Sequence, residues 1–106
     1  MARRLITDTE NELYFSVVNL WEIVIKTGRG KLGFQIDAAR VRQNLLNNGY
    51  VEVPIVSNHA IAVSTLPALH KDPFDRLLVA QAVVEGITLL TVDPVVAKYP
   101  GPVRKV

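Results

Sequence analysis

Three carboxylates occupy positions in the sequence from which they could hold a divalent cation. Glu22 and Asp75 each lie in the first turn of a predicted helix, and Asp93 directly follows a predicted strand. In an open parallel sheet, the carboxyl ends of the strands and the starts of the following helices share one edge, and ligands bind there. Carboxylates crowded at that edge repel one another and raise one another's pKa. A divalent cation removes this repulsion, and it can also activate water beside a phosphodiester.

Each of these acids also has a purely structural explanation. Asp72 is a typical N-cap, followed by Pro73 at the first helical position. Glu22 and Asp75 can face the positive end of a helix dipole, and Asp93 can cap a final short helix. We assign Asp72 to capping. Spacing alone leaves Glu22, Asp75 and Asp93 open between capping and cation binding.

Other polar residues are weaker candidates. Ser16 and Thr91 lie near strand ends, where a hydroxyl could orient a metal-bound water or simply be tolerated in the strand. Lys26 and Arg76 could meet RNA phosphates, although a solvated surface explains them equally well. His59 lies among apolar residues of a predicted helix, and we expect it at the surface or half-buried.

The elements that must position these residues alternate between strand and helix. Asn19, with Glu22 three residues later, predicts the start of the first of these helices through a capping box. The alternation favours an α/β fold with a mostly parallel sheet flanked by helices. The predicted strands cover residues 12–18, 50–55 and 87–92, with a last edge strand over 102–106, and the predicted helices cover 19–28, 36–49, 57–69 and 72–86.

Composition limits the chemistry further. The chain has 106 residues, of which 49% are hydrophobic and 21% charged, so we expect one globular domain. The absence of cysteine excludes disulfides, thiolate zinc sites and cysteine nucleophiles. Two histidines are too few for a histidine-rich metal site, so a metal would rest mainly on oxygen ligands, which suits Mg²⁺ or Mn²⁺.

Charge and hydropathy say less about partners and location. The net charge of +2 permits a nucleic-acid partner without arguing strongly for one. No apolar run approaches the roughly 20 residues of a membrane helix, and the first residues do not resemble a signal peptide. We therefore expect a cytoplasmic protein that does not associate with a membrane.

Three segments together resemble one protein family. "SVVNLWEIVIKTGRGKL", "LPALHKDPFDRLLVAQAVVEG" and "TLLTVDPVVAKY" are similar to the PIN-domain toxins of type II toxin–antitoxin systems, the VapC-like ribonucleases. The resemblance runs from about Ala2 to the C-terminus. It implies a PIN-like three-layer α/β fold in a single domain over residues 1–106.

The resemblance also implies an activity and its residues. It implies a metal-dependent endoribonuclease that binds Mg²⁺ or Mn²⁺, cuts RNA and pairs with a cognate antitoxin. Glu22, Asp75 and Asp93 match the acids that hold the cation, and Thr91 lies on the approach to the same edge. The cation would polarise the scissile phosphate and lower the pKa of an attacking water, and one of the acids would help to deprotonate that water.

The chain departs from the family pattern at its start. The family begins with a hydrophobic strand that ends in an aspartate, and "LITDTEN" does not match it, so we interpret Asp8 as a turn residue. We therefore expect an N-terminally truncated domain without its first, central strand. The exposed strand edges predict a marginally stable monomer, a domain-swapped or homodimeric assembly, or direct pairing of the two neighbouring strands. The function is then either a ribonuclease impaired by truncation or an inactive remnant that binds an antitoxin or dimerises.

Overall fold

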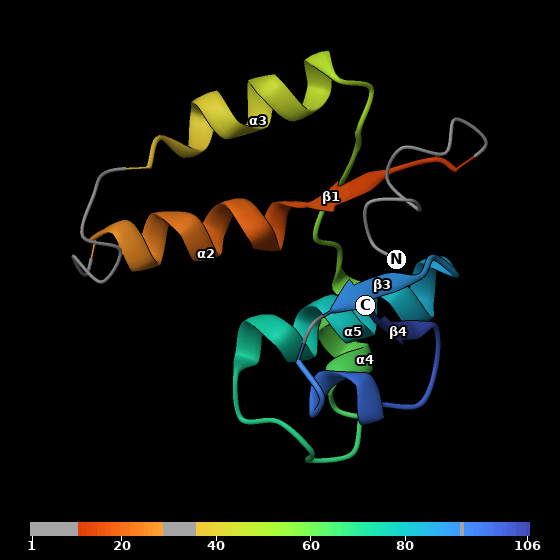
Figure 1. Cartoon of the computed structure of the whole chain (residues 1–106). Coiled ribbons are helices and arrows are strands. Elements are labelled where there is room, and N and C mark those ends of the chain that lie inside the picture. The colour runs from red at the N-terminus through yellow and green to blue at the C-terminus, as the bar shows by residue number, and fades with distance from the viewer. Residues whose placement is uncertain (1–10, 29–35, 92) are drawn as a thin grey trace. The chain divides into compact units, whose positions relative to one another are not determined.

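The computed structural model describes residues 11–28, 36–91 and 93–106, which fall into two compact units (Figure 1). The described residues up to Pro54 form the N-terminal unit, and Ile55–Val106 form the C-terminal unit. Asp8, a turn residue by prediction from the sequence, lies outside the described residues.

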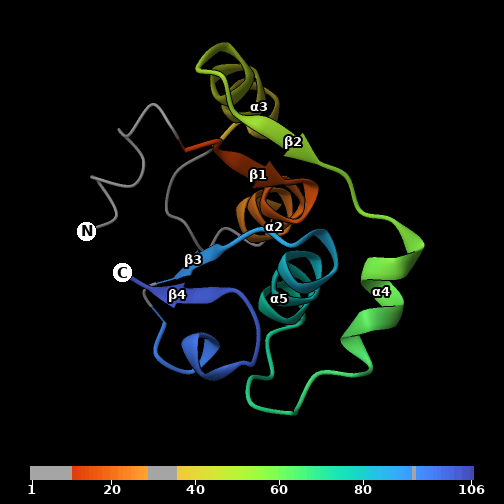
Figure 2. The same cartoon turned by 90° about the vertical axis from the view of Figure 1, so that its right-hand side faces the viewer.

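The N-terminal unit pairs two short parallel strands and two helices. Strand β1 runs beside β2 with Tyr14 opposite Val51 and Ser16 opposite Val53, and Figure 2 shows the two strands side by side. Phe15 and Val53 are buried, and helix α2 packs against α3. The elements are β1 (Tyr14–Ser16), α2 (Val17–Gly28), α3 (Ala38–Asn47) and β2 (Val51–Val53).

Helix α2 begins earlier than the capping pattern at Asn19 predicts. The hydroxyl of Ser16 accepts a hydrogen bond from the backbone N–H of Val18 at 2.9 Å, and the side chain of Asn19 accepts one from the N–H of Ser16 at 2.8 Å. Ser16 is therefore the N-cap, and Asn19 is its reciprocal partner three residues later. The prediction of an N-cap at Asn19 is wrong by one helical turn, and Glu22 lies in the second turn of α2.

The C-terminal unit contains the remaining helices and a second pair of parallel strands. Helix α4 packs against α5, and β3 pairs with β4 (Figure 2). A small core of Val79, Val96 and Tyr99 is covered by Leu66, Leu89 and Val103. The elements are α4 (Ser57–Val63), α5 (Pro73–Glu85), β3 (Leu89–Thr91), the 3₁₀ helix η1 (Val96–Lys98) and β4 (Val103–Lys105).

Helix α5 confirms its predicted ends. The Asp72 carboxylate accepts hydrogen bonds from the backbone N–H groups of Phe74 at 2.8 Å and Asp75 at 3.4 Å, with Pro73 in the first turn. Gly86 ends the helix in the left-handed conformation at φ 68°, which favours glycine. Asp72 is thus a cap, and Asp75 is fixed as the third residue of the helix.

The predicted α/β class is confirmed, with parallel strands and helices in alternation. The described strands form two two-stranded sheets, β1 with β2 in the N-terminal unit and β3 with β4 in the C-terminal unit. The expected direct pairing of the two strands beside the missing one stays a prediction. No helix in the described part of the chain is long and apolar enough to cross a membrane.

Candidate metal centre

Three side chains of the C-terminal unit converge at the start of α5. The ligand atoms of His70, Asp75 and Asp93 all lie within 4.8 Å of one another. The His70 Nε2 atom is 3.1 Å from Asp93 Oδ2 and 3.6 Å from Asp75 Oδ2. Two of the three sequence-predicted acids are therefore brought together, although 18 residues separate them along the chain.

Asp93 is held in place by the backbone that surrounds it. Its Oδ1 atom accepts hydrogen bonds from the N–H of Val95 at 2.8 Å and of Val96 at 3.4 Å, so it caps the turn that leads into η1, which is one of the two roles that the sequence left open. Its own N–H donates to the Thr91 hydroxyl at 3.0 Å. Because Oδ1 is used for capping, Oδ2 is the oxygen that faces the cluster. Asp93 is thus both a cap and a site residue, and Thr91 orients it.

The electrostatics keep Asp93 ionised. The hydrogen bond from the Val95 N–H is the largest cause that lowers the Asp93 pKa below its usual value, and the hydrogen bond from His70 lowers the pKa further. Partial burial opposes this effect. Charge on Oδ2 is therefore maintained at neutral pH, which a cation ligand requires.

His70 is fixed at both its backbone and its ring. Its N–H donates to the hydroxyl of Tyr99 at 2.9 Å, and Tyr99 is itself buried in the core. Its Nδ1 atom accepts a hydrogen bond from the N–H of Asp72 at 2.9 Å. The loop before α5 thus presents Nε2 to the two carboxylates in one orientation.

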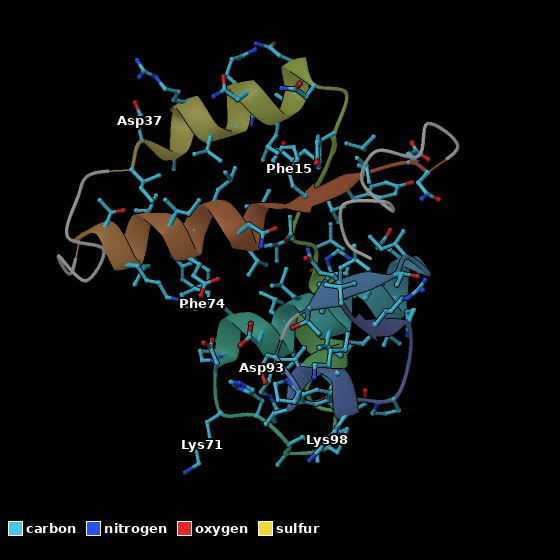
Figure 3. All side chains as sticks on the ribbon, viewed as in Figure 1. Phe15, Asp37, Lys71, Phe74, Asp93 and Lys98 are labelled. Atoms are coloured by element: carbon cyan, nitrogen blue, oxygen red, sulfur yellow. The ribbon has the colours of Figure 1, made fainter. Side chains whose placement is uncertain are left out.

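The cluster is open to solvent on one side. The side chains of His70, Asp75 and Asp93 are 22%, 29% and 38% exposed, so water and a solute can reach the carboxylates. Asp93 lies beside η1, and Lys71, on the loop before α5, extends away from the ribbon (Figure 3). The cluster offers two carboxylates, the hard oxygen ligands that Mg²⁺ and Mn²⁺ prefer, so the residues present fit such a cation.

The other predicted site residues have contacts elsewhere. Glu22 lies in the N-terminal unit, where its carboxylate forms an ion pair with Lys26 one turn later on α2. Ser16 caps α2 and is buried. The guanidinium of Arg76 donates to the carbonyl of Val63 at 3.2 Å, which ties α5 to the end of α4. Roles of Glu22, Ser16, Lys26 and Arg76 toward a metal or RNA stay predictions.

His70, a member of the cluster, and Tyr99, which supports it, are not among the site residues that the sequence predicts. Two histidines are too few for a histidine-rich centre, so the sequence does not mark His70 as a ligand. The available signal was position: His70 stands two residues before the cap of the helix that carries Asp75, so it reaches the same helix end. Tyr99 carried no such signal, because its contact with His70 spans 29 residues.

Comparison with known protein families gives one match. The family model described as PIN domain matches residues 1–102, which is nearly the whole chain. Neither the curated proteins nor the solved structures include a match to this chain.

Proposed function

The chain belongs to the PIN domain family, and on that premise we propose that it is a Mg²⁺- or Mn²⁺-dependent endoribonuclease, the toxin of a toxin–antitoxin pair. PIN domains are generally metal-dependent nucleases, so family membership supports a nuclease function. The proposal adds the substrate, which is RNA, the identity of the cation and the toxin role.

The observation that carries the proposal is the convergence of Asp75 and Asp93. Their Oδ2 atoms face a common point although one belongs to the start of a helix and the other follows a strand. These two carboxylates would hold the cation, whereas a ligand role for Glu22 rests on the family resemblance of its segment alone. A set of oxygen ligands with net negative charge suits a hard divalent cation.

When bound, a divalent cation supplies a Lewis acid for the scissile phosphate and a means of activating water. The chain's own residues provide the setting for that chemistry. Asp93 keeps its negative charge at neutral pH because backbone N–H groups hydrogen-bond to its carboxylate. Thr91 keeps Asp93 in orientation, and Asp72 keeps the first turn of α5 formed, so that Asp75 stays in place. Exposed Lys71, next to His70, is available to an RNA phosphate.

The proposed partners follow from the toxin role. We propose a cognate antitoxin, a homodimer and a cytoplasmic location. Apolar side chains exposed on the C-terminal unit support binding to a protein partner, because large exposed apolar groups often mark interaction sites. They include Ile61 on α4 at 66% exposure and Val83 and Val84 on α5 at 45% and 39%.

These exposed residues also favour a second candidate function. A chain that binds an antitoxin or dimerises without cutting RNA would need the apolar surface of α4 and α5 but not the carboxylates. The two functions differ in one respect that can be measured: only the ribonuclease depends on the charge of Asp75.

The test is RNA cleavage by the purified full chain. A structured RNA is incubated with the protein and Mn²⁺, with and without a chelator, and with the Asp75→Asn variant. The proposal expects cleavage that stops with the chelator and falls by about 100-fold or more in Asp75→Asn, because the cation loses a charged ligand. Asp37→Asn is the matched control, since Asp37 caps α3 and asparagine is an equally good cap.

A folded wild-type chain that leaves RNA intact in Mn²⁺ would contradict the ribonuclease proposal and favour the inactive partner-binding protein. Cleavage that Asp75→Asn and Asp37→Asn retain equally would contradict the assignment of the site.

A further inference from the structure

We propose that His70 is a positioning residue that hydrogen-bonds to Asp93, one of the two carboxylates proposed to hold the metal, and does not itself bind the metal. The inference rests on the proposed metal site and adds a residue to it. His70 is close enough to Asp75 and Asp93 to be counted with them as a possible third ligand, because its Nε2 atom lies within 4.8 Å of both. The hydrogen bonds around its ring distinguish the two roles.

The first step is the protonation of the ring. The backbone N–H of Asp72 can only donate, and it points at His70 Nδ1 over 2.9 Å. The Nδ1 atom must therefore offer its lone pair. A neutral imidazole has one protonated and one unprotonated nitrogen, so the proton lies on Nε2. A protonated nitrogen has no lone pair for a metal, whereas it is a donor to a carboxylate.

The second step is the distance from Nε2 to the acids. A separation of 3.1 Å from Asp93 Oδ2 is a normal N–H···O hydrogen bond, while 3.6 Å from Asp75 Oδ2 is beyond one. His70 therefore donates to Asp93 and lies next to Asp75. Since a carboxylate oxygen has two lone pairs, Asp93 Oδ2 can accept from His70 and still face a cation.

The third step is the support of His70 itself. The hydroxyl of buried Tyr99 accepts from the His70 N–H at 2.9 Å, so the loop is tied to the core. The chain of contacts runs from Tyr99 to His70 to Asp93, and each contact spans more than 20 residues of sequence. Residues that orient metal ligands in this way commonly change metal affinity 10- to 100-fold when they are replaced.

Two substitutions separate the two hydrogen bonds of the ring. In His70→Asn the amide oxygen stands near the position of Nδ1, so it can accept from the Asp72 N–H, but no donor reaches Asp93. In His70→Gln the longer side chain can place an N–H near the position of Nε2. Neither asparagine nor glutamine titrates, so the substituted side chain is uncharged in both variants. Mn²⁺ affinity is measured by calorimetry, with circular dichroism to confirm that each variant is folded.

The expected result is about a 10-fold or greater loss of Mn²⁺ affinity in His70→Asn and a smaller loss in His70→Gln. In addition, long-range ¹H–¹⁵N correlation spectra of the wild-type chain should show the proton of His70 on Nε2, both without metal and after addition of Mg²⁺. These spectra do not depend on catalysis.

Other results would overturn the inference. Equal Mn²⁺ affinity in the wild-type chain and both variants would show that His70 does not position the ligands. Loss of the Nε2 proton signal on Mg²⁺ addition would make His70 a ligand. A wild-type chain that binds no Mn²⁺ would overturn the proposed metal-dependent function, and this inference with it, whereas the first two results leave that function intact.

Discussion

The two units of the molecule fix their polar side chains by contacts of different range. In the C-terminal unit three contacts cross the chain, in addition to local caps: His70 to Asp93 spans 23 residues, His59 to Glu85 spans 26 and the contact of His70 with Tyr99 spans 29. The N-terminal unit relies on nearer partners, such as the caps of α2 over 2 and 3 residues and the Arg42–Glu52 ion pair over 10.

This difference explains why the candidate site lies in the C-terminal unit. A ligand site requires side chains from distant parts of the chain to be held at fixed distances, and hydrogen bonds over a long sequence separation do this. Local caps and exposed ion pairs stabilise the element that carries them, but they do not bring two elements together. In the C-terminal unit, Asp93 is tied to the loop before α5 through His70 and Tyr99.

The largest expected effect concerns His59, which is 1% exposed. Its Nε2 donates to Glu85 at 2.8 Å, and its Nδ1 accepts from the Val56 N–H at 3.1 Å. We expect His59→Ala to lower the free energy of unfolding by about 2–3 kcal/mol, since it leaves a cavity at a fully buried side chain and removes a hydrogen-bond partner of buried Gln81. Urea denaturation measures the loss. Arg42→Ala, which removes an exposed ion pair of the N-terminal unit, should cost clearly less. Equal losses would contradict the contrast between the units.

Substitution of Glu22 tests whether the N-terminal unit contributes a ligand to the metal. If it supplies the third carboxylate, Glu22→Gln should weaken Mn²⁺ binding by about tenfold, because the charge of the ligand set falls by one. Calorimetry measures the affinity. Lys26→Gln, which removes the partner of Glu22 on α2, is the matched control and should not weaken Mn²⁺ binding. Unchanged affinity in Glu22→Gln would confine the metal site to the C-terminal unit.

Gly101 tests the packing of the loop before β4. Its φ of +113° is unfavourable for other residues, and an added Cβ would lie 2.8 Å from a methyl carbon of Val83. We expect Gly101→Ala to lower the free energy of unfolding by at least about 1 kcal/mol. Thermal and urea unfolding measure it. Gly28→Ala at the end of α2 meets no atom within 4 Å and should be neutral or stabilising. If Gly101→Ala leaves the free energy of unfolding unchanged, the loop before β4 can accommodate an added Cβ, and the prediction is wrong.

The smallest expected effect is a loss of folding stability at acidic pH. The Asp93 pKa is lowered from its usual 3.8, chiefly by the Val95 N–H, so its ionisation stabilises the folded chain above that pH. This contribution is lost as the pH falls below 3.8 toward the folded-state pKa. Asp93→Asn can keep the cap on η1, so its urea midpoint should fall less than that of the wild type between pH 6 and pH 3.

Glu52 provides the comparison in the other unit. Its pKa is also lowered, but by a hydrogen bond from the exposed Arg42. Salt screens exposed ion pairs more than backbone hydrogen bonds. The difference in pH-dependent stability between the wild type and Glu52→Gln should therefore become smaller in 0.5 M salt (roughly a 4 Å Debye length). The corresponding difference between the wild type and Asp93→Asn should persist. The opposite salt response would contradict the assigned causes.

The sequence predicted features whose causes are local. The ends of α5 were predictable because Asp72, Pro73 and Gly86 act on the backbone within a few residues, and the structure confirms them. The strand before Asp93 was predictable from its apolar run. The predicted start of α2 was wrong by one turn, since serine and asparagine are both common N-cap residues. Ser16 is the N-cap because the buried strand β1 ends there.

The sequence did not predict features that depend on distant partners. His59 was expected to be exposed or half-buried, but Glu85 and Gln81 of α5 pair with its ring and it is buried. Asp75 and Asp93 were predicted as site residues, yet His70 between them was not. No pattern near His70 indicates that a carboxylate 23 residues later will meet its ring.

The most direct test of the account is Mn²⁺ binding to the double variant Asp75→Asn with Asp93→Asn. Calorimetry on the wild-type chain should detect a bound Mn²⁺ ion. The folded double variant should bind none, because neutral amides replace both carboxylates of the C-terminal cluster. If the double variant binds Mn²⁺ as the wild type does, the metal does not rest on Asp75 and Asp93, and the central claim fails.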